Sequence, residues 1–304
     1  MTLRAFAPGK VNLCLFLGGP RPDGRHELVT LFQPVSLADE LLLSEGVDGG
    51  EDVVVCPGVE GVNLAERALA ELRARGWKGP PVRVEIAKGI PVAGGMAGGS
   101  ADAAATLRLA AAAGCPLSVE VMAEIARALG ADVPSQLAPG PALGTEAGEV
   151  VSSVPHRGPH AFVILPSPAQ LATAAVFAEA DRLRLARSDA ELLDRRRALE
   201  TALHSGPELP AELLVNDLEP AARSLCPLID DALECAHELE VDTALVCGSG
   251  PTVAGIFWGA DAPARALFAA AAVRERFPEA VAVVPVDADF ASVRDVGRHP
   301  RPAQ

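Results

Sequence analysis

The chain has 304 residues, of which 49% are hydrophobic and 22% charged, and its formal net charge is −14. This length and composition exclude a disordered chain and leave room for one large domain or two of ordinary size. The acidic balance and the scatter of basic residues exclude a nucleic-acid-binding patch. Without an apolar run of about 20 residues we expect no membrane span, and without an apolar stretch before Lys10 we expect no secretory signal.

The first half of the chain mixes strand-like and helix-like patterns. Short apolar or alternating runs predict strands at 4–7, 11–17, 30–35, 41–44, 53–56 and 82–86. Apolar residues at helical spacing predict helices at 64–75, 101–113 and 118–129, the last with Ser118 as its N-cap. Strands that lead into helices without strict alternation are typical of an α+β domain.

The second half predicts a different arrangement. Strands are expected at 161–165, 243–247, 253–257 and 280–286, and helices at 173–185, 190–204, 228–239 and 263–276. Apart from the polar helix at 190–204, this order is close to a ferredoxin-like split with an insertion. The stretch 139–158, which contains several Gly and Pro residues, is the expected boundary between domains at 1–150 and 151–290. Residues 291–304 are expected to form a disordered tail.

The most informative segment is rich in glycine and lies between an expected strand and an alanine-rich helix. Its main members are Gly94, Gly95, Gly98, Gly99, Ser100 at the expected N-cap, and Asp102 in the first turn. Glycines let the backbone approach a ligand closely, and the free N–H groups of a helix start favour phosphate. No G-K-[ST] follows, so this is not a Walker A loop. It is a phosphate cradle of another type, or else a tight turn or flexible linker.

Three further segments carry candidate residues. Lys10 and Asn12 lie two apart, hence on one face of an expected strand, where a lysine can meet a phosphate; a surface lysine is the alternative. Asp132 precedes Pro134 and is either a helix N-cap or a carboxylate that takes a hydroxyl proton. The turn at 247–252 is either an ordinary hairpin or a second backbone nest at the phosphate site.

The cysteines bear on the cellular compartment. They stand at 14, 56, 115, 226, 235 and 247, with no C-x-x-C pair and no histidine cluster that would complete a metal site. We interpret them as buried thiols that behave as small hydrophobic residues. Because such thiols suit a reducing compartment, we expect a cytoplasmic protein.

Three of these segments together resemble a known superfamily. P-G-K-V-N at 8–12, P-V-A-G-G-M-A-G-G-S-A-D-A-A at 91–104 and G-S-G-P-T at 248–252, in this order, are similar to the three motifs of the GHMP kinases. More narrowly, D-G-R-H-E-L-V-T-L-F-Q at 23–33 resembles a signature of the 4-diphosphocytidyl-2-C-methyl-D-erythritol kinase family, as do segments 63–64, 129–134 and 216–219. The resemblance covers nearly the whole chain.

The resemblance implies a fold and an activity. The fold would be α+β, with an N-terminal ribosomal-S5-like domain and a C-terminal ferredoxin-like domain. The enzyme would belong to the non-mevalonate (MEP) isoprenoid route and would use ATP and Mg²⁺ to phosphorylate the 2-hydroxyl of a cytidine diphosphate substrate. The expected partner is thus a small molecule, and the chain would be a monomer or a homodimer.

The resemblance also implies roles for single residues. Asp132 matches the catalytic base, Lys10 its partner at the transferring phosphate, and Asn12 a nearby substrate contact. His26 matches a residue that bonds the cytosine edge, and Phe177 an aromatic residue that stacks on cytosine. The positions that match the ATP site are Asn63 and Lys88 near the adenine, and Gly94, Gly95, Met96, Ala97, Gly98, Gly99 and Ser100 along the triphosphate. The third motif adds Gly248, Ser249, Gly250 and Thr252 on the substrate side. Ser100 is the candidate contact for Mg²⁺, which the phosphates would otherwise hold.

One departure from the family leaves alternatives open. Arg25 stands where the family has a tyrosine that stacks on cytosine, although an arginine plane can also stack on a base. A GHMP kinase that acts on a mevalonate-type compound, homoserine or a sugar is one alternative, against which His26 and Phe177 argue. A catalytically idle nucleotide-binding protein is the other, and Lys10, Asp132 and Ser100 together argue against it.

Overall fold

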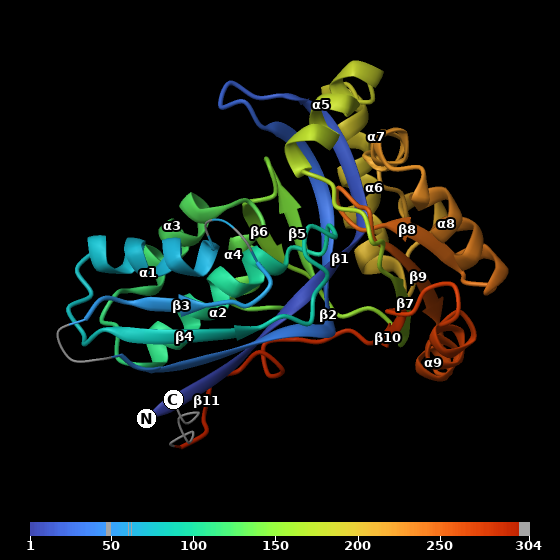
Figure 1. Cartoon of the computed structure of the whole chain (residues 1–304). Helices are drawn as coiled ribbons and strands as arrows, with labels where there is room; N and C mark the ends of the chain where they lie inside the picture. The colour runs from blue at the N-terminus through green and yellow to red at the C-terminus, as the bar shows by residue number, and fades with distance from the viewer. Residues whose placement is uncertain (47–49, 60, 62, 298–304) are drawn as a thin grey trace.

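The computed structural model describes residues 1–46, 50–59, 61 and 63–297, and it places two sheets side by side with helices packed on both (Figure 1). This mixture of separate helices and largely antiparallel strands confirms the predicted α+β class. The chain completes the first sheet, apart from one short strand, before it enters the second.

Two long antiparallel strands, β1 (Thr2–Pro20) and β2 (His26–Glu45), form the centre of the first sheet. The sequence predicted four short strands here, which was wrong. The breaks in the apolar pattern are irregularities of register, between Pro8 and Lys10 and between Asn12 and Cys14, inside one continuous pair. Lys10 and Asn12 therefore lie in the middle of a sheet, with little freedom to move.

The remaining strands of the first sheet add to both ends of β2. One end pairs with β4 and the other with β5, so that β2 connects two parts of the sheet. The strands are β3 (Val53–Val55), β4 (Val82–Ala87), β5 (Ala142–Thr145), β6 (Val150–Ser153) and, beside β1, β11 (Arg294–Asp295). Their helices are α1 (Leu64–Ala74), α2 (Gly98–Ala112), α3 (Val119–Leu129) and α4 (Val133–Leu137).

Helix α2 lies closest to the first sheet. Its buried face is mostly alanine, including Ala101 and the run Ala103–Ala105, so the helix packs tightly against β1 and β2. The helix also contacts α1 and α4, which places its N-terminus beside Asp132 at the start of α4. The predicted N-cap of α3 is confirmed, because the Ser118 side chain accepts a hydrogen bond from the Val121 N–H.

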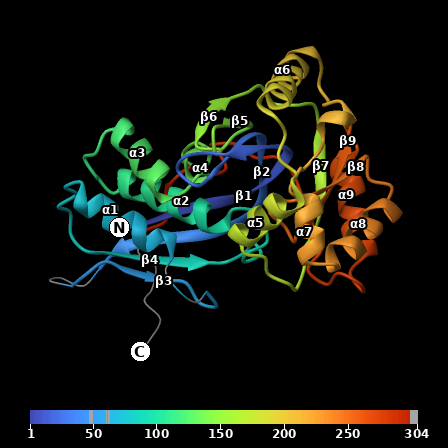
Figure 2. The same ribbon diagram turned by 90° about the horizontal axis from the view of Figure 1, so that it is seen from above.

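The second sheet has the strand order β10-β7-β9-β8, all antiparallel, which is the order of a ferredoxin-like fold. Its strands are β7 (His160–Leu165), β8 (Thr243–Val246), β9 (Val253–Trp258) and β10 (Val281–Val283). The helices of this half are α5 (Thr173–Leu183), α6 (Asp189–Ser205), α7 (Glu219–Leu225), α8 (Leu228–Glu238) and α9 (Ala262–Ala272), with a 3₁₀ turn at Ala211–Leu213. The view from above shows α8 and α9 against this sheet, away from the first one (Figure 2).

Strand β7 shows why the two halves pack together. Phe162 and Ile164 belong to the core that the first sheet builds, whereas Ala161, Val163 and Leu165 belong to the core under the helices of the second half. Both faces of β7 are therefore buried, which is why its sequence is a continuous apolar run.

The region around the expected domain boundary contains regular structure that the sequence analysis did not predict. The stretch 139–158 includes β5 and β6, and β5 pairs with β2. Helices α4 and α7 were not predicted, because each is too short to show a periodic apolar pattern. The domain boundary at 150 stays a prediction.

The C-terminal segment also differs from its prediction. Residues 291–297, expected in a disordered tail, dock on the first sheet: Ala291 is buried, its carbonyl oxygen accepts a hydrogen bond from the Arg108 guanidinium, and β11 pairs with β1. Burial of Ala291 and backbone pairing offset the entropy of ordering the segment. Residues 298–304 lie outside the described part of the chain.

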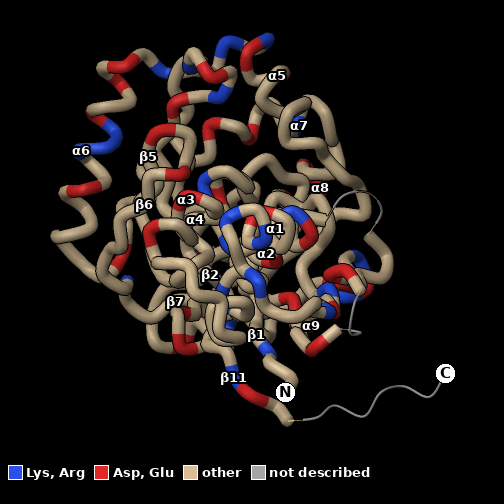
Figure 3. Tube along the Cα trace, turned by 90° about the vertical axis from the view of Figure 1, so that its left-hand side faces the viewer, with Lys and Arg blue, Asp and Glu red and all other residues tan. Residues whose placement is uncertain are grey.

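Two further features of the fold are the distribution of its charged residues and the lengths of its helices. Basic and acidic residues are interspersed along α6 and elsewhere in the chain, as a view coloured by charge shows (Figure 3). None of the helices in the described residues is long and apolar enough to cross a membrane.

Candidate active site

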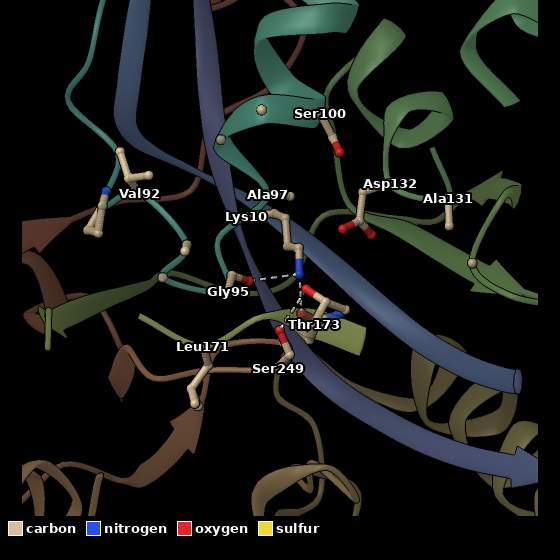
Figure 4. Close-up of a pocket in the computed structure, with 18 of the residues that line it drawn as sticks. Lys10, Val92, Gly95, Ala97, Ser100, Ala131, Asp132, Leu171, Thr173 and Ser249 are labelled. Carbon is tan, nitrogen blue, oxygen red and sulfur yellow. Dashed lines mark hydrogen bonds between the residues drawn. The ribbon is translucent and has the colours of Figure 1, made fainter. Parts of the chain in front are cut away.

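A cleft of about 520 Å³ opens where β1, β2, the glycine-rich segment, the start of α5 and the turn after β8 meet (Figure 4). Most of the predicted site residues line it: Lys10, Asn12, Asn63, Lys88, Gly94, Gly95, Ala97, Gly98, Gly99, Ser100, Asp132, Phe177, Gly248 and Ser249. Five predicted residues do not line it: Arg25, His26, Met96, Gly250 and Thr252. The structure thus brings together groups that are up to about 240 residues apart in the sequence.

The glycine-rich segment ends in a helix that begins earlier than predicted. Ala97 is the N-cap, in the left-handed conformation with φ 59°, and α2 starts at Gly98. The prediction that Ser100 is the N-cap is therefore wrong, and Ser100 lies inside the first turn. In the described residues no group accepts a hydrogen bond from the N–H of Gly98, Gly99 or Ser100. These donors, at the positive end of the helix dipole, fit a phosphate chain.

The glycine-rich segment is held from behind by the turn after β8. A side chain on Gly95 would come within 1.9 Å of the Cys247 carbonyl oxygen, so only glycine permits this approach. The Thr252 N–H donates to the Gly94 carbonyl oxygen at 3.4 Å, and the Lys10 N–H donates to that of Met96 at 3.1 Å. Met96 and Thr252 are thus placed behind the cleft, where they support its wall.

Lys10 is not a surface lysine, because only 3% of it is exposed. Its Nζ donates to Asn12 Oδ1 at 2.6 Å and to the Gly95 carbonyl oxygen at 3.1 Å (Figure 4). The Asn12 amide in turn donates to Thr30 Oγ1 at 2.7 Å. Thr30 was not predicted, yet it fixes the orientation of Asn12 and so leaves the Asn12 oxygen facing the ammonium group.

Asp132 points into the same space as Lys10 and Ser100 (Figure 4). It occupies the N-cap position of α4, but its side chain caps no N–H group. Within the described residues its carboxylate makes neither a hydrogen bond nor an ion pair. The structure therefore does not support a capping role, and the half-buried carboxylate is available to a ligand in the cleft.

Lys88 is bound by two carboxylates, which the sequence did not indicate. Its Nζ contacts Asp39 Oδ2 and Asp102 Oδ2, the latter at 2.8 Å. Asp39, which is fully buried, also accepts hydrogen bonds from the N–H groups of Gly89 and Ile90 at 2.7 and 2.9 Å. No sequence motif identifies Asp39, because it lies in β2, 49 residues before Lys88. The three side chains join β2 to the segment after β4 and to α2.

The contribution of this cluster to stability depends on pH through the Asp102 carboxyl group. Burial raises the pKa of Asp102 to about 7, and the ammonium group of Lys88 only partly opposes the rise. In the unfolded chain the same carboxyl would titrate near pH ~3.9. Between these values the folded protein binds one more proton than the unfolded chain does, so the contribution of Asp102 to stability falls as the pH rises through about 7.

We expect Asp102→Asn to remove this part of the pH dependence. In the wild type the free energy of unfolding should fall between pH 5 and 7, by at most ~1.4 kcal/mol per pH unit for one proton. Urea unfolding of the wild type and the variant at several pH values measures the difference. Asp194→Asn, on the exposed face of α6, is the control and should leave the slope unchanged. Equal slopes for the wild type and Asp102→Asn would contradict the prediction.

Phe177, on α5, lines the cleft, and the His26 ring contacts the Phe177 ring without lining the cleft itself. The two ring centroids are 5.1 Å apart, with 33° between the planes. The His26 ring also bonds Asp181 Oδ1 through Nε2, at 2.8 Å. The Arg25 guanidinium does not lie over Phe177; it contacts the carboxylates of Asp23 and Glu149, each at 2.7 Å. Thr173, which the sequence analysis missed, lines the cleft and bonds Ser249 Oγ at 3.1 Å.

The described residues contain no cluster of three or more His, Cys, Asp or Glu side chains that would hold a metal ion by itself. A magnesium ion in this cleft would therefore take most of its ligands from phosphates, and the Ser100 hydroxyl fits as an additional oxygen ligand. The cysteines do not contribute chemistry here, because none of them lines the cleft and burial raises the pKa of Cys247, behind it, to about 12.

The chain is similar to characterised families over most of its length. The model described as GHMP kinases N terminal domain matches residues 63–140, and the model described as GHMP kinases C terminal matches residues 197–279. The 4-diphosphocytidyl-2-C-methyl-D-erythritol kinase of Streptomyces coelicolor is 41% identical over 261 residues, which are 84% of this chain and 87% of that protein. The enzyme of the same name from Mycolicibacterium gilvum is 45% identical over 81% of this chain and 79% of its own.

Solved structures agree with these sequence matches. A crystal structure of a 4-(cytidine 5'-diphospho)-2C-methyl-D-erythritol kinase superposes with a TM-score of 0.74 and 32% identity, covering 93% of this chain and 98% of that one. The homoserine kinase of Cytophaga hutchinsonii superposes with a TM-score of 0.67 over 96% of this chain and 97% of its own, but at 16% identity it shares the fold alone.

Proposed function

The chain belongs to the 4-diphosphocytidyl-2-C-methyl-D-erythritol kinases of the GHMP kinase family, and we propose that it transfers the γ-phosphoryl group of ATP to the 2-hydroxyl of 4-diphosphocytidyl-2-C-methyl-D-erythritol. This reaction belongs to the non-mevalonate route to isoprenoid precursors. The observation that carries the proposal is the convergence of Lys10, Asp132 and the free N–H groups at the start of α2 on one cleft.

Phosphoryl transfer needs positioning and charge stabilisation more than covalent chemistry. The N–H groups of Gly98, Gly99 and Ser100 would bind phosphate oxygens and so fix the direction of the triphosphate. The Lys10 ammonium, already held by Asn12 and Gly95, would meet the negative charge that develops on the transferred group. Because these donors are in place before the reaction, little reorganisation is needed.

Asp132 would act on the acceptor. Its free carboxylate would accept a hydrogen bond from the acceptor hydroxyl and align that oxygen with the γ-phosphorus. It would take up the hydroxyl proton as the new P–O bond forms, the bond to the β,γ-bridging oxygen breaks and ADP leaves. Mg²⁺, held mainly by the phosphates and reached by Ser100, would supply charge neutralisation between the phosphate groups. We further propose a cytoplasmic location, which the six free cysteines support.

An assay with different acceptor substrates distinguishes this function from the functions of related kinases. Purified protein should consume ATP in the presence of 4-diphosphocytidyl-2-C-methyl-D-erythritol and Mg²⁺, and not in the presence of mevalonate or homoserine. Product analysis by phosphorus NMR should show one new phosphomonoester on the erythritol part. ATP consumption with homoserine or mevalonate alone would replace the proposed acceptor, and no consumption with any of them would contradict a kinase.

We expect Phe177→Ala to weaken the cytidine substrate selectively. Stacking of a base on an aromatic ring is worth about 1–3 kcal/mol, so the KM or Kd for this substrate should rise roughly 5- to 150-fold. ATP affinity should not change, because Phe177 belongs to α5 and the proposed triphosphate contacts come from the glycine-rich segment. Phe268→Ala is a matched control, since Phe268 is 77% exposed on α9, outside the cleft. Equal effects of the two variants would remove Phe177 from the base site.

A further inference from the structure

The turn between β5 and β6 forms one wall of the cleft. Ala147 and Gly148 line the cavity in this turn, next to Ala131 and Asp132. A Cβ atom on Gly148 would lie in van der Waals contact with Phe32, Leu28 and Ala131, at 3.7 to 4.0 Å, so the turn borders directly on these residues. Any shift of this turn therefore changes the space beside the Asp132 carboxylate.

The conformation of this turn needs support from outside it. Glu146, which is not glycine, has φ 60°, and Gly148 has φ 103°, so the turn passes twice through the left-handed region. A non-glycine residue rarely adopts that conformation without surrounding interactions that hold it. One such interaction is the hydrogen bond from the Leu28 N–H to the Glu146 carbonyl oxygen, at 2.6 Å.

The second support is the buried carboxylate of Glu149, of which only 8% is exposed. One of its oxygens accepts a hydrogen bond from the Ala147 N–H at 2.9 Å, inside the turn. The other contacts the Arg25 guanidinium at 2.7 Å, which reaches over from the β1–β2 connection. Glu149 thus joins the cleft wall to a segment more than 120 residues earlier in the chain.

The contacts of the Arg25 guanidinium favour this structural role over a direct contact with the substrate. Its guanidinium also binds Asp23, so both acidic neighbours neutralise its charge, and it makes no cation–π contact with the Phe177 ring. A base-stacking arginine would need an open face over the cleft, yet Arg25 does not line the cleft. A diphosphate-binding arginine would need to leave Glu149, whose buried carboxylate would then lose its cation.

We propose that Glu149 and Arg25 act as a pair of positioning residues, which fix the β5–β6 turn as the wall of the acceptor-substrate site. The inference rests on the proposed function, because it concerns the cytidine substrate. The pair touches neither substrate nor ATP. Its effect passes through Ala147 and Gly148, which line the cleft, and it explains how this chain shapes the site without the tyrosine that the family resemblance leads one to expect at position 25.

The test is a double-mutant cycle in which KM is measured for the cytidine substrate and for ATP. Glu149→Gln keeps an acceptor for the Ala147 N–H and leaves Arg25 paired with Asp23, so we expect KM for the cytidine substrate to rise about threefold. Arg25→Gln leaves the buried Glu149 carboxylate unpaired, and we expect a rise of roughly tenfold. In the double variant the rise should return to about threefold. KM for ATP and the unfolding midpoint of the double variant should stay at the wild-type values.

Two further variants distinguish a positioning role of Arg25 from a stacking role and provide a control. Arg25→Tyr should weaken the cytidine substrate as Arg25→Gln does and recover in combination with Glu149→Gln, whereas a stacking role for position 25 predicts equal or better binding for Arg25→Tyr alone. Glu200→Gln removes an exposed ion pair on α6, outside the cleft, and as the control it should change nothing. Arg25→Tyr also serves if Arg25→Gln does not fold.

Three results would overturn the inference. They are additive effects in the cycle, parallel changes in KM for ATP, and an Arg25→Tyr variant that binds as well as the wild type. A wild type that phosphorylates the cytidine substrate while the cycle shows no coupling overturns the positioning role alone. A wild type that does not phosphorylate it overturns the proposed function, and this inference with it.

Discussion

Asp132→Asn should lower the turnover number by roughly 10² to 10⁴, the usual range for the loss of a general base. The amide has nearly the shape of the carboxylate but cannot take up the hydroxyl proton. Because the Asp132 side chain makes no hydrogen bond in the described residues, its replacement breaks no structural contact. The KM for ATP and the free energy of unfolding should therefore stay close to the wild-type values, and rapid-quench measurement of the chemical step should locate the loss there.

The chain contains a matched control for this variant. Asp261 occupies the N-cap of α9, is followed by Ala262-Pro263 as Asp132 is followed by Val133-Pro134, and likewise caps no N–H group. It lies outside the cleft, so Asp261→Asn should leave turnover unchanged. If Asp132→Asn kept most of its activity, Asp132 would have no part in the chemistry. If both variants lost activity together, the effect would come from helix stability instead.

Lys10→Ala should lower the turnover number by about 10² to 10³, the cost of removing one preorganised donor at developing charge. The KM for ATP should rise much less, because the interaction strengthens in the transition state. Lys10→Arg should recover little activity. A planar guanidinium is wider than an ammonium group, and the space around Nζ is limited by Asn12 and Gly95.

Because Lys10 is buried, Lys10→Ala removes both a charge and packing contacts. A second variant is therefore needed to separate the two effects. Lys10→Met keeps most of the stem in the core while it removes the charge, and it should lose as much turnover as Lys10→Ala with a smaller loss of stability. Lys78→Ala, at an exposed position, is the control and should have no effect. Steady-state kinetics with each substrate varied in turn, together with thermal unfolding, distinguish the cases. A change in KM alone would make Lys10 a ground-state ligand only.

Much of the phosphate-binding geometry could be predicted, because it depends on neighbours in the sequence. Glycines at 94, 95, 98 and 99 permit the close approach and the left-handed turn before α2, and the alternation of a strand puts Lys10 and Asn12 on one face. The exact start of α2 could not be predicted, since a left-handed Ala97 is not the residue that such a position favours.

The sequence by itself determined the α+β class and the glycine-rich candidate phosphate segment, because both depend on local spacing and residue type, and its family resemblance pointed to Asp132 and Lys10 as the candidate base and lysine. Only the tertiary structure decided which charges meet. Lys88 pairs with Asp39 and Asp102, and Arg25 with Glu149, through contacts that span from 14 to more than 120 residues of chain. Such pairs leave no periodic signal, since they form where the packing of separate strands and helices excludes water from the carboxylates and so makes an unpaired charge costly.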